Sequence, residues 1–247
     1  TINSMTKGIK AFASRTDWFC ILVGDRKTPV ANEFDHSKIT FISYDSQAEL
    51  GFNLESHLPV DHYCRKNLGY LVAIRNGTEV IAESDDDNIP YDSWGTGLDE
   101  LFSLKKYKVV SSPKFFNIYT LFCDEHIWPR GFPLDAIGKG KNFQYTEENF
   151  DKVLIWQGLA DIDPDVDAIF RLVFGGKEVI LKQNQKPVIL GKGVYCPFNS
   201  QNTIWRKEVF AYLYLPLFVR FRFTDILRGY VTQRGLWAME GRLAFGG

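Results

Sequence analysis

The chain has 247 residues, a formal net charge of -1, 45% hydrophobic residues and 24% charged residues. This composition is typical of a globular protein and excludes a disordered or fibrous one. The balanced charge argues against general nucleic-acid binding, because no basic field is available to hold a phosphate backbone. The four cysteines lie far apart without metal-ligand spacing, so we expect reduced thiols in a reducing compartment, the cytosol. They are Cys20, Cys64, Cys123 and Cys196.

The sequence predicts no transmembrane segment. Its longest apolar stretch, residues 211–223, contains Pro216, Arg220 and Arg222. A membrane-spanning helix needs roughly 20 apolar residues, so this stretch is too short and too charged. The first residues also lack the apolar core and small-residue cleavage site of a signal peptide.

Two short apolar runs in the first third of the chain are typical of buried strands. Residues 18–23, WFCILV, stop abruptly at a Gly-Asp loop, and residues 79–83 lead directly into the acidic run that begins at Asp85. Between them we expect a strand at residues 38–44 and a helix within residues 61–75. This order predicts an α/β fold with an open, mostly parallel, twisted sheet and helices on both faces. Ligands in such sheets bind beyond the carboxyl ends of the strands.

The second half of the chain is less regular because prolines interrupt it, among them Pro113, Pro129, Pro133, Pro164, Pro187 and Pro197. We predict strands at residues 108–112, 168–174 and 178–181, and a helix that begins near Thr224. No internal repeat or convincing linker is present, so we expect one domain over residues 1–247. Its two functional halves would be a nucleotide-binding half, about residues 17–90, and an acceptor-binding and catalytic half, about residues 91–247.

Asp85, Asp86 and Asp87 follow a predicted buried strand. Like charges this close raise one another's pKa unless a cation lies among them, and their hard oxygen atoms suit Mg²⁺ or Mn²⁺. A solvated acidic turn is the alternative, and for an isolated Asp-Asp-Asp it is the default. Because the three aspartates directly follow a predicted buried strand, we favour the metal site over the solvated turn. An EF-hand is excluded because its glycine and distant glutamate are missing.

Arg65 and Lys66 stand on the predicted helix before the acidic strand, where both could reach a diphosphate. Simple surface solvation is the alternative for such a pair. Gly24, Asp25 and Lys27, in the loop after the first strand, could contact a base and ribose, or could form a turn with Pro29.

The segment around Trp128, Arg130 and Gly131 is rigid and aromatic and carries one cation. It suits stacking on a sugar and pairing with a phosphate or carboxylate, although a structural Pro-rich loop is the alternative. Four aspartates alternate along residues 161–167 and suit a second metal or an acceptor hydroxyl. The alternative for these aspartates is an exposed loop without a ligand. We single out Asp165 and Asp167 as candidates for substrate binding.

Asp225 begins the last predicted helix, and three polar or aromatic residues follow it: Arg228, Arg234 and Trp237. An acidic residue at a helix start is often only a capping residue or a partner of the helix dipole. The same carboxylate could instead be the general base that deprotonates an acceptor hydroxyl.

Four separated motifs resemble the plant STELLO glycosyltransferase-like proteins and their microbial relatives. They are residues 51–88, which end in ESDDDN, then WPRGFPLD, then IWQGLADIDPDVDAIFRL, then the stretch from CPFNSQNTIW to QRGLW. The resemblance covers most of the chain from about Lys38 onward, in the same order. The acidic run and the WPRG motif also resemble the reversibly glycosylated polypeptides, which are mutases of nucleotide-activated arabinose.

The resemblance implies a nucleotide-sugar-binding fold of the GT-A type. It implies that residues 85–87 act as a DxD-like motif for manganese or magnesium and the donor diphosphate. The plant proteins have a differently spaced acidic cluster. Asp225 with Gln233, Arg234 and Trp237 is similar to the acid and downstream signature of inverting glycosyltransferases, although Thr224 replaces their usual glutamate. By resemblance to the mutases, Arg130 would be a glycosylated residue.

Three functional hypotheses follow. The leading one is a metal-dependent, inverting transferase that moves a sugar from a nucleoside diphosphate, with UDP as the expected nucleotide, to a carbohydrate or glycolipid acceptor in polysaccharide or glycoconjugate synthesis. Asp225 would be its base, and Arg65, Lys66, Arg228 and Arg234 would add charge. The second is a mutase or self-glycosylating protein that uses Arg130. The third is a non-catalytic scaffold for other glycan-synthesis enzymes. A microbial member would work in the cytoplasm, where it could associate with a membrane, and a plant-type member would work in the Golgi.

Overall fold

The computed structural model describes residues 4–15, 17–28, 34–103, 107–138, 143–150, 152–176, 178–182 and 185–246. Pro29, in the loop expected after the first strand, lies outside these residues. The helices are α1 (Lys7–Ala13), α2 (Lys66–Arg75), α3 (Leu98–Ser103), α4 (Tyr119–Phe122), α5 (Ala168–Phe174) and α6 (Thr224–Ala238). The strands are β1 (Cys20–Val23), β2 (Ile39–Ile42), β3 (Val80–Ser84), β4 (Tyr107–Ser112), β5 (Gln144–Glu148), β6 (Val153–Gly158), β7 (Val188–Leu190), β8 (Asn202–Arg206) and β9 (Arg242–Gly246).

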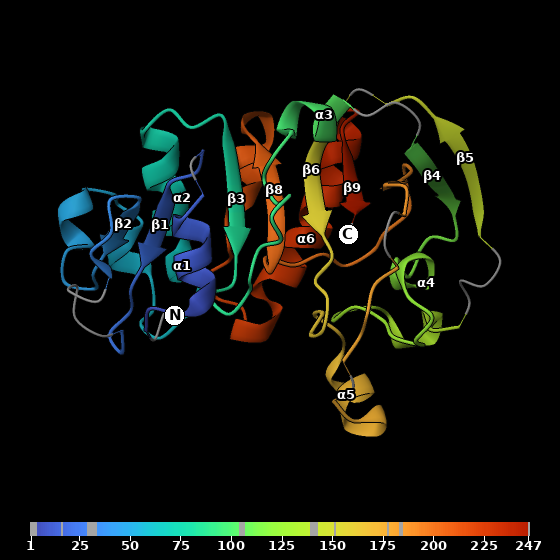
Figure 1. Cartoon of the computed structure of the whole chain (residues 1–247), viewed down its shortest axis with the longest axis horizontal. Helices are drawn as coiled ribbons and strands as arrows, with labels where there is room; N and C mark the ends of the chain where they lie inside the picture. The colour runs from blue at the N-terminus through green and yellow to red at the C-terminus, as the bar shows by residue number, and fades with distance from the viewer. Residues whose placement is uncertain are drawn as a thin grey trace.

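The α/β architecture is confirmed, but the main sheet is mixed rather than mostly parallel. β1 and β2 form a parallel pair, and seven strands form a second sheet in the order β3-β8-β6-β9-β7-β4-β5 (Figure 1). In the larger sheet β6–β9 and β4–β7 are parallel, and the other neighbouring pairs are antiparallel. The expectation rested on the strand–helix–strand order of the first third. The irregular second half supplies β8, which inserts antiparallel between β3 and β6.

Helices pack on both faces of the seven-stranded sheet, as expected. On one face Leu236 of α6 packs in a hydrophobic cluster with Leu243 and Phe245 of β9. On the other face Phe102 of α3 packs with Ala244 of the same strand. The alternation of side chains along a strand places these β9 residues on opposite faces, so both faces are buried.

The predicted strand at residues 168–174 is wrong, because this segment is helix α5. Its residues favour strands by composition, but Asp167 accepts a hydrogen bond from the Ile169 N–H at 2.8 Å and caps a helix start. Gly175, with φ of 75°, then ends the helix. The predicted strand at residues 178–181 is also wrong: Val179 forms only an isolated bridge with Ile162.

The other predicted elements are confirmed within a few residues: β1, β2, β3, β4, α6, and α2 preceded by a short 3-10 turn at Tyr63–Arg65. All four cysteines are free thiols, as expected, and three of them are buried. Across the described ranges, no helix has the length and apolarity that crossing a membrane requires.

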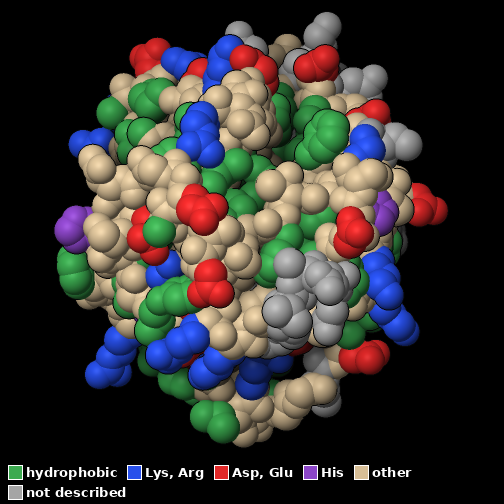
Figure 2. All heavy atoms as spheres, turned by 90° about the vertical axis from the view of Figure 1, so that its left-hand side faces the viewer, with side chains coloured by type: hydrophobic (Ala, Val, Ile, Leu, Met, Phe, Trp, Pro, Cys, Tyr) green, Lys and Arg blue, Asp and Glu red, His purple; other side chains and the backbone are tan. Residues whose placement is uncertain are grey.

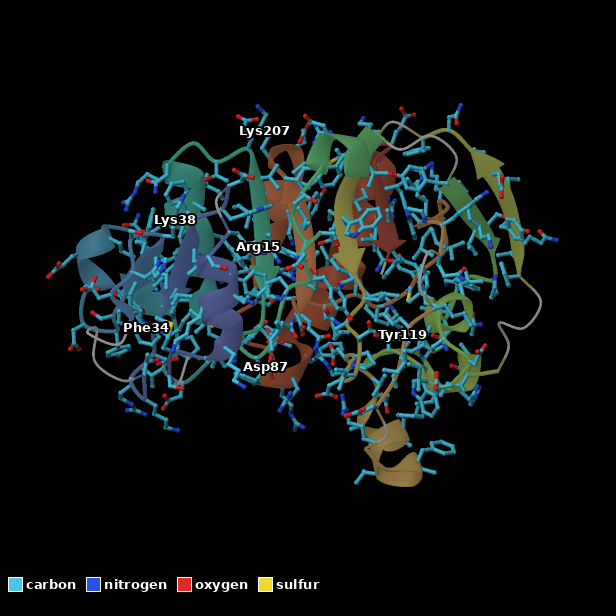
Figure 3. All side chains as sticks on the ribbon, in the orientation of Figure 1. Arg15, Phe34, Lys38, Asp87, Tyr119 and Lys207 are labelled. Carbon is cyan, nitrogen blue, oxygen red and sulfur yellow. The ribbon has the colours of Figure 1, made fainter. Side chains whose placement is uncertain are left out.

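The strand directions bring the ends of β3 and β6 to one edge of the sheet. β8 is antiparallel to both, so β3 and β6 point the same way. Asp85 follows β3 at this edge, and the loop that contains Asp165 follows β6. Figure 3 labels Asp87 at the lower edge of the molecule, the edge from which α5 projects. This edge therefore carries the candidate site, as the ligand rule for open sheets predicts.

Candidate functional site

Asp85 is held at the end of β3 by two groups, one from the first residue of α2 and one from the 3-10 turn before it. The Tyr63 hydroxyl lies 3.0 Å from Asp85 Oδ1, and Lys66 Nζ lies 3.8 Å from the same oxygen. Lys66 Nζ also donates to Tyr63 Oη at 3.1 Å and to the Ser84 carbonyl at 3.2 Å. Lys66, which the sequence suggested as a diphosphate contact, therefore lies beside the first aspartate of the acidic run.

Burial raises the pKa of Asp85 above its ordinary value, and the charges of Asp87 and Asp225 raise it further. Lys66 and the Tyr63 hydroxyl oppose this rise without cancelling it. The three aspartates are not equivalent. Asp87 is exposed, whereas the Asp86 backbone carbonyl accepts a hydrogen bond from the Thr6 hydroxyl before α1. Asp87 and Asp225 are the carboxylates whose charges act on Asp85.

A divalent metal fits these residues only together with a ligand that brings further oxygens. Within the described parts of the chain, no three His, Cys, Asp or Glu side chains converge into a group that could hold a metal ion. Mg²⁺ typically keeps several waters and uses one or two carboxylates together with substrate phosphates. The repulsion between Asp85 and Asp87 is the conflict that such a cation would relieve.

Asp225 lies in the first turn of α6, and its side chain is only 7% exposed. Arg130 Nη2 donates to Asp225 Oδ2 at 2.8 Å, and Arg130 Nη1 donates to Oδ1 at 3.1 Å. Burial alone would raise the pKa of Asp225, but the hydrogen bonds and charge of Arg130 outweigh burial and hold it below its ordinary value. Asp225 is therefore an ionised carboxylate at neutral pH.

Arg130 is shared between two carboxylates. Its Nε and Nη2 donate to Asp165 at 2.8 and 2.7 Å, while its terminal nitrogens reach Asp225. Nη1 also donates to the Arg222 carbonyl. Every N–H of the guanidinium is thus directed at an oxygen of the protein. The sequence suggested that Arg130 pairs with a phosphate or carboxylate of a ligand, whereas in the structure it pairs with two carboxylates of the protein itself.

Gly131 permits the close approach of the Trp-Pro-Arg-Gly loop to α6. Its φ is 80°, and a Cβ there would lie 2.5 Å from Ile226 Cγ2. The Tyr230 hydroxyl donates to the Gly131 carbonyl at 3.0 Å. Glycine is therefore required here for backbone conformation and packing, and it fixes Arg130 beside Asp225.

Two residues that the sequence did not single out connect Asp225 to Asp85. Ser200 Oγ lies 3.5 Å from Asp225 Oδ2 and 3.0 Å from the Tyr63 hydroxyl. Tyr63 in turn contacts Asp85. Nothing in the local sequence marks a lone Tyr or Ser as part of this chain. Only the pairing of β3 with β8 brings the loop before β8 next to Asp85.

Arg65 and Arg228 do not have the predicted role of binding a diphosphate, because each is buried and bound to the protein. Arg65 donates to Gln47 at 2.9 Å, to the Leu58 carbonyl at 3.0 Å and to Glu55 at 3.2 Å. Arg228 forms a 2.6 Å ion pair with Glu83, and both side chains are almost completely buried. Buried cations require such partners, so these arginines stabilise the fold.

The loop after β1 is organised by Asp25, which is 3% exposed. Its carboxylate accepts three backbone hydrogen bonds of 2.8 to 3.1 Å, from Arg26, Asp61 and His62. Gly24 packs against Phe41, and the Lys27 side chain is 72% exposed. The structure thus gives Asp25 a loop-forming role. Of the three predicted residues here, Lys27 is the one left open to solvent.

The remaining candidates lie elsewhere. Trp128 is 5% exposed and packs against Phe170 of α5, so it is a core residue and not a sugar-stacking surface. Asp167 caps α5. Arg234 and Trp237 lie nine and twelve residues after Asp225 on the same helix, about 14 and 18 Å along its axis. They are therefore distant from the Asp225 carboxylate, and their contacts with donor and acceptor stay predictions.

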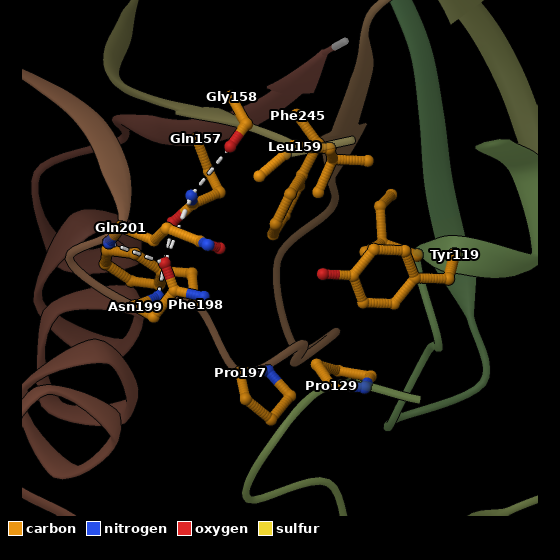
Figure 4. A pocket seen from close by; sticks show the side chains of 12 residues that line it. Tyr119, Pro129, Gln157, Gly158, Leu159, Pro197, Phe198, Asn199, Gln201 and Phe245 are labelled. Carbon is orange, nitrogen blue, oxygen red and sulfur yellow. Dashed lines mark hydrogen bonds between the residues drawn. The ribbon is translucent and has the colours of Figure 1, made fainter. Parts of the chain in front are cut away.

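A small polar cavity adjoins this site (Figure 4). It encloses about 10 Å³, room for roughly one water molecule. The amides of Gln157, Asn199 and Gln201 lie on one side, and the Tyr119 hydroxyl points in from the other. Pro129, which precedes Arg130, closes a third side. The cavity suits a single uncharged polar group.

Comparison with known proteins adds two related sequences. No protein-family model matches the chain. Over 97% of its length the chain is 33% identical to a protein of Arabidopsis thaliana named "Probable glycosyltransferase STELLO1" and 31% identical to "Probable glycosyltransferase STELLO2" of the same plant. The chain spans about a third (33%) of the length of each of these relatives.

Proposed function

This chain belongs to a STELLO-like family, and on that premise we propose that it is a glycosyltransferase that moves a sugar from a nucleoside diphosphate to an acceptor hydroxyl. The observation that carries the proposal is the line of contacts from Asp85 through Tyr63 and Ser200 to Asp225. It sets an exposed acidic edge, suited to a metal and diphosphate, beside a buried carboxylate suited to accept a proton.

Asp225 is the proposed general base. Arg130 and Ser200 hold its two oxygens, so the carboxylate is oriented before substrate arrives. Its lowered pKa keeps it ionised at neutral pH, and the Arg130 contacts that lower the pKa also weaken it as a base. An acceptor hydroxyl would replace one of these contacts and pass its proton to Asp225. The reaction would invert the anomeric carbon, because Asp225 acts only as a base.

Asp85 and Asp87 are the proposed ligands for Mn²⁺ or Mg²⁺ that arrives with the donor. Such a metal would supply positive charge that stabilises the departing diphosphate. Lys66 adds a fixed positive charge 3.8 Å from Asp85, where it can bind a diphosphate oxygen. UDP is the expected nucleotide.

Arg130 is a positioning residue in this proposal. Burial alone would lower its pKa, but the two carboxylates reverse this effect and raise the pKa above its ordinary value. A guanidinium that stays protonated and has every N–H bonded to oxygen is a poor nucleophile. This arrangement favours the transferase over self-glycosylation at Arg130. Mass spectrometry after incubation with nucleotide sugars tests this preference, since a glycosylated Arg130 would contradict it.

The test of the proposal separates binding from turnover. Calorimetric titration with UDP and UDP-sugars, with and without Mn²⁺, is combined with an assay of donor hydrolysis. Asp85→Asn is expected to abolish the metal-dependent part of nucleotide binding. Asp225→Asn is expected to change binding less than twofold and to slow turnover by about 10²- to 10⁴-fold, the usual contribution of a general base.

Asp124→Asn is the matched control, because this exposed carboxylate pairs with Lys182 outside the site. It should leave both binding and turnover unchanged. Full turnover in Asp225→Asn would remove the base from the mechanism. Failure of the wild-type chain to bind any nucleotide at millimolar concentration, with and without Mn²⁺, would favour the scaffold instead.

A further inference from the structure

Helix α5 carries an exposed apolar surface away from the body of the molecule. Leu172 is 85% exposed, Val173 66% and Phe174 51%. Ile169, on the same helix, is 45% exposed. Figure 1 shows α5 projecting from the lower edge, below the ends of the strands. Contiguous apolar residues exposed to this degree typically mark an interaction surface.

A second exposed segment, residues 218–223, combines aromatic and basic side chains. Phe218 is 95% exposed, and Phe221 and Phe223 are both more than 40% exposed. Arg220 and Arg222 alternate with these rings and are exposed as well. Neither arginine forms an ion pair with a carboxylate in the part of the chain that the structure describes. Two positive charges are therefore available beside the three aromatic rings.

Both segments lie beside Arg130 at the same edge of the molecule. Arg130 binds Asp165, in the loop that leads into α5, and it donates to the backbone carbonyl of Arg222. Figure 2 keeps the vertical axis of Figure 1 and shows Lys and Arg side chains gathered at the lower edge, just above hydrophobic side chains at the lowest part of the molecule. The exposed apolar side chains and the positive charges thus lie at the same edge of the molecule.

We propose that α5 and residues 218–223 together form a membrane-docking surface that inserts its apolar side chains into the headgroup region of an anionic lipid bilayer. Ile169, Leu172, Val173, Phe174, Phe218, Phe221, Phe223, Arg220 and Arg222 make up this surface. Apolar residues beside free basic residues are the pattern that binds such interfaces, since lipid chains take up the apolar groups and anionic headgroups pair with the cations.

Carboxylates also lie near the docking surface, and two of those nearest to α5 are paired with arginines. Asp163, at the base of α5, is paired with Arg171 at 2.6 Å, and Asp165 is paired with Arg130. These carboxylates are therefore compensated locally. Helix α5 projects from the molecule, and a deformable bilayer can accept a projecting helix, whereas a protein partner would need a groove that matches it. Docking in this way would place Asp85 and Asp225 next to the membrane surface, whatever reaction they perform.

Co-sedimentation with lipid vesicles tests the proposal. The whole chain is expected to bind vesicles of phosphatidylcholine with phosphatidylglycerol more tightly than vesicles of phosphatidylcholine alone, and high salt should weaken the difference. The double variant Leu172→Gln/Val173→Gln should lose binding to both. The double variant Arg220→Gln/Arg222→Gln should weaken binding to anionic vesicles by about fivefold for each arginine, which leaves little preference for them.

Two controls remove an apolar residue or two positive charges elsewhere on the surface. Ile74→Gln removes an exposed apolar residue from the last turn of α2, at the other end of that helix from Lys66. Arg75→Gln/Lys207→Gln removes two positive charges, one of them at the upper edge, where Figure 3 labels Lys207. Both should bind like the wild type, and circular dichroism checks that every variant is folded.

Three outcomes would overturn the proposal. The first is that the wild-type chain binds neither kind of vesicle. The second is that binding is equal in the wild type and in both docking-surface variants. The third is a dimer in sedimentation velocity that Leu172→Gln/Val173→Gln converts to a monomer, because the apolar surface would then bind a second copy of the chain.

Discussion

At the scale of single residues, the sequence did not reveal which Arg and Lys side chains are free of internal ion pairs. Arg65, Arg130 and Arg228 all looked suited to bind anions. Each instead pairs with a carboxylate of the protein, and Arg228 does so almost without exposure to solvent. Lys66 alone among the predicted diphosphate contacts lies beside Asp85. A buried cation must find an internal partner, and that partner can be far away in sequence, as Glu83 is from Arg228.

The buried Glu83–Arg228 pair gives a first prediction. Glu83→Gln should lower the free energy of unfolding by about 3–5 kcal/mol, because it leaves the Arg228 charge buried without compensation. Adding Arg228→Met to Glu83→Gln should recover part of the lost free energy of unfolding, because the unpaired buried charge is then removed. Urea-induced unfolding of the wild type and the variants measures both effects.

The exposed ion pair between Glu79 and Lys207 is the control for this prediction. Both side chains are more than half exposed, so Glu79→Gln should cost at most about 1 kcal/mol. Equal losses in Glu79→Gln and Glu83→Gln would contradict the distinction between the two pairs.

A second prediction concerns pH and Asp225. Its folded-state pKa is lower than its unfolded-state pKa, so the ionised form stabilises the fold above about pH 4. This stabilisation is lost as the pH falls through the lowered folded-state value. The difference in unfolding free energy between the wild type and Asp225→Asn should therefore be largest near neutral pH and shrink below about pH 4. Urea titrations from pH 7 to pH 3 measure it, and a difference that grows with acidity would contradict the lowered pKa.

At the scale of elements, the site depends on how a loop docks on a helix. The Trp-Pro-Arg-Gly loop contacts the first turns of α6 through Gly131, and its Arg130 then reaches Asp225. The sequence identified both the loop and the helix start as functional candidates. It did not indicate that they bind each other, because contacts between segments 95 residues apart leave no local signature.

Gly131→Ala tests this docking. The substitution combines a φ of 80° with a Cβ 2.5 Å from Ile226 Cγ2, and it should cost about 1–3 kcal/mol of stability and weaken any function that needs Asp225. Gly138→Ala is the control, because Gly138 has a similar φ of 82° but open space around it. The difference between the two losses in urea unfolding reports the clash. Equal losses would show that the approach to α6 is not tight.

At the scale of the whole molecule, one sheet joins the two predicted halves of the chain. β3, from the first half, pairs along its length with β8 from the second, and the Glu83–Arg228 ion pair ties the same strand to α6. A nucleotide-binding half that folds by itself would have to break these contacts. We therefore propose that the two halves are functional regions of one cooperative unit.

Cooperativity can be measured directly. Unfolding in urea is expected to give one transition, with the same midpoint by tryptophan fluorescence and by far-ultraviolet circular dichroism. Trp18 in the first half and five tryptophans in the second half, among them Trp205, make fluorescence sensitive to the whole chain. Two separated transitions would instead indicate that the halves are independent domains.

The sequence by itself determined the strands and helices with strong local patterns, namely β1 to β4, α2 and α6, and it identified Asp85, Lys66, Arg130 and Asp225 as candidates. These features depend on periodicity, punctuation by glycine and proline, and residue chemistry, which are local. Only the tertiary structure decided the mixed strand order, the helical state of α5 and the internal pairing of the arginines. It also placed Tyr63 and Ser200 between Asp85 and Asp225. These outcomes depend on contacts between distant segments, where burial and pairing override local preference.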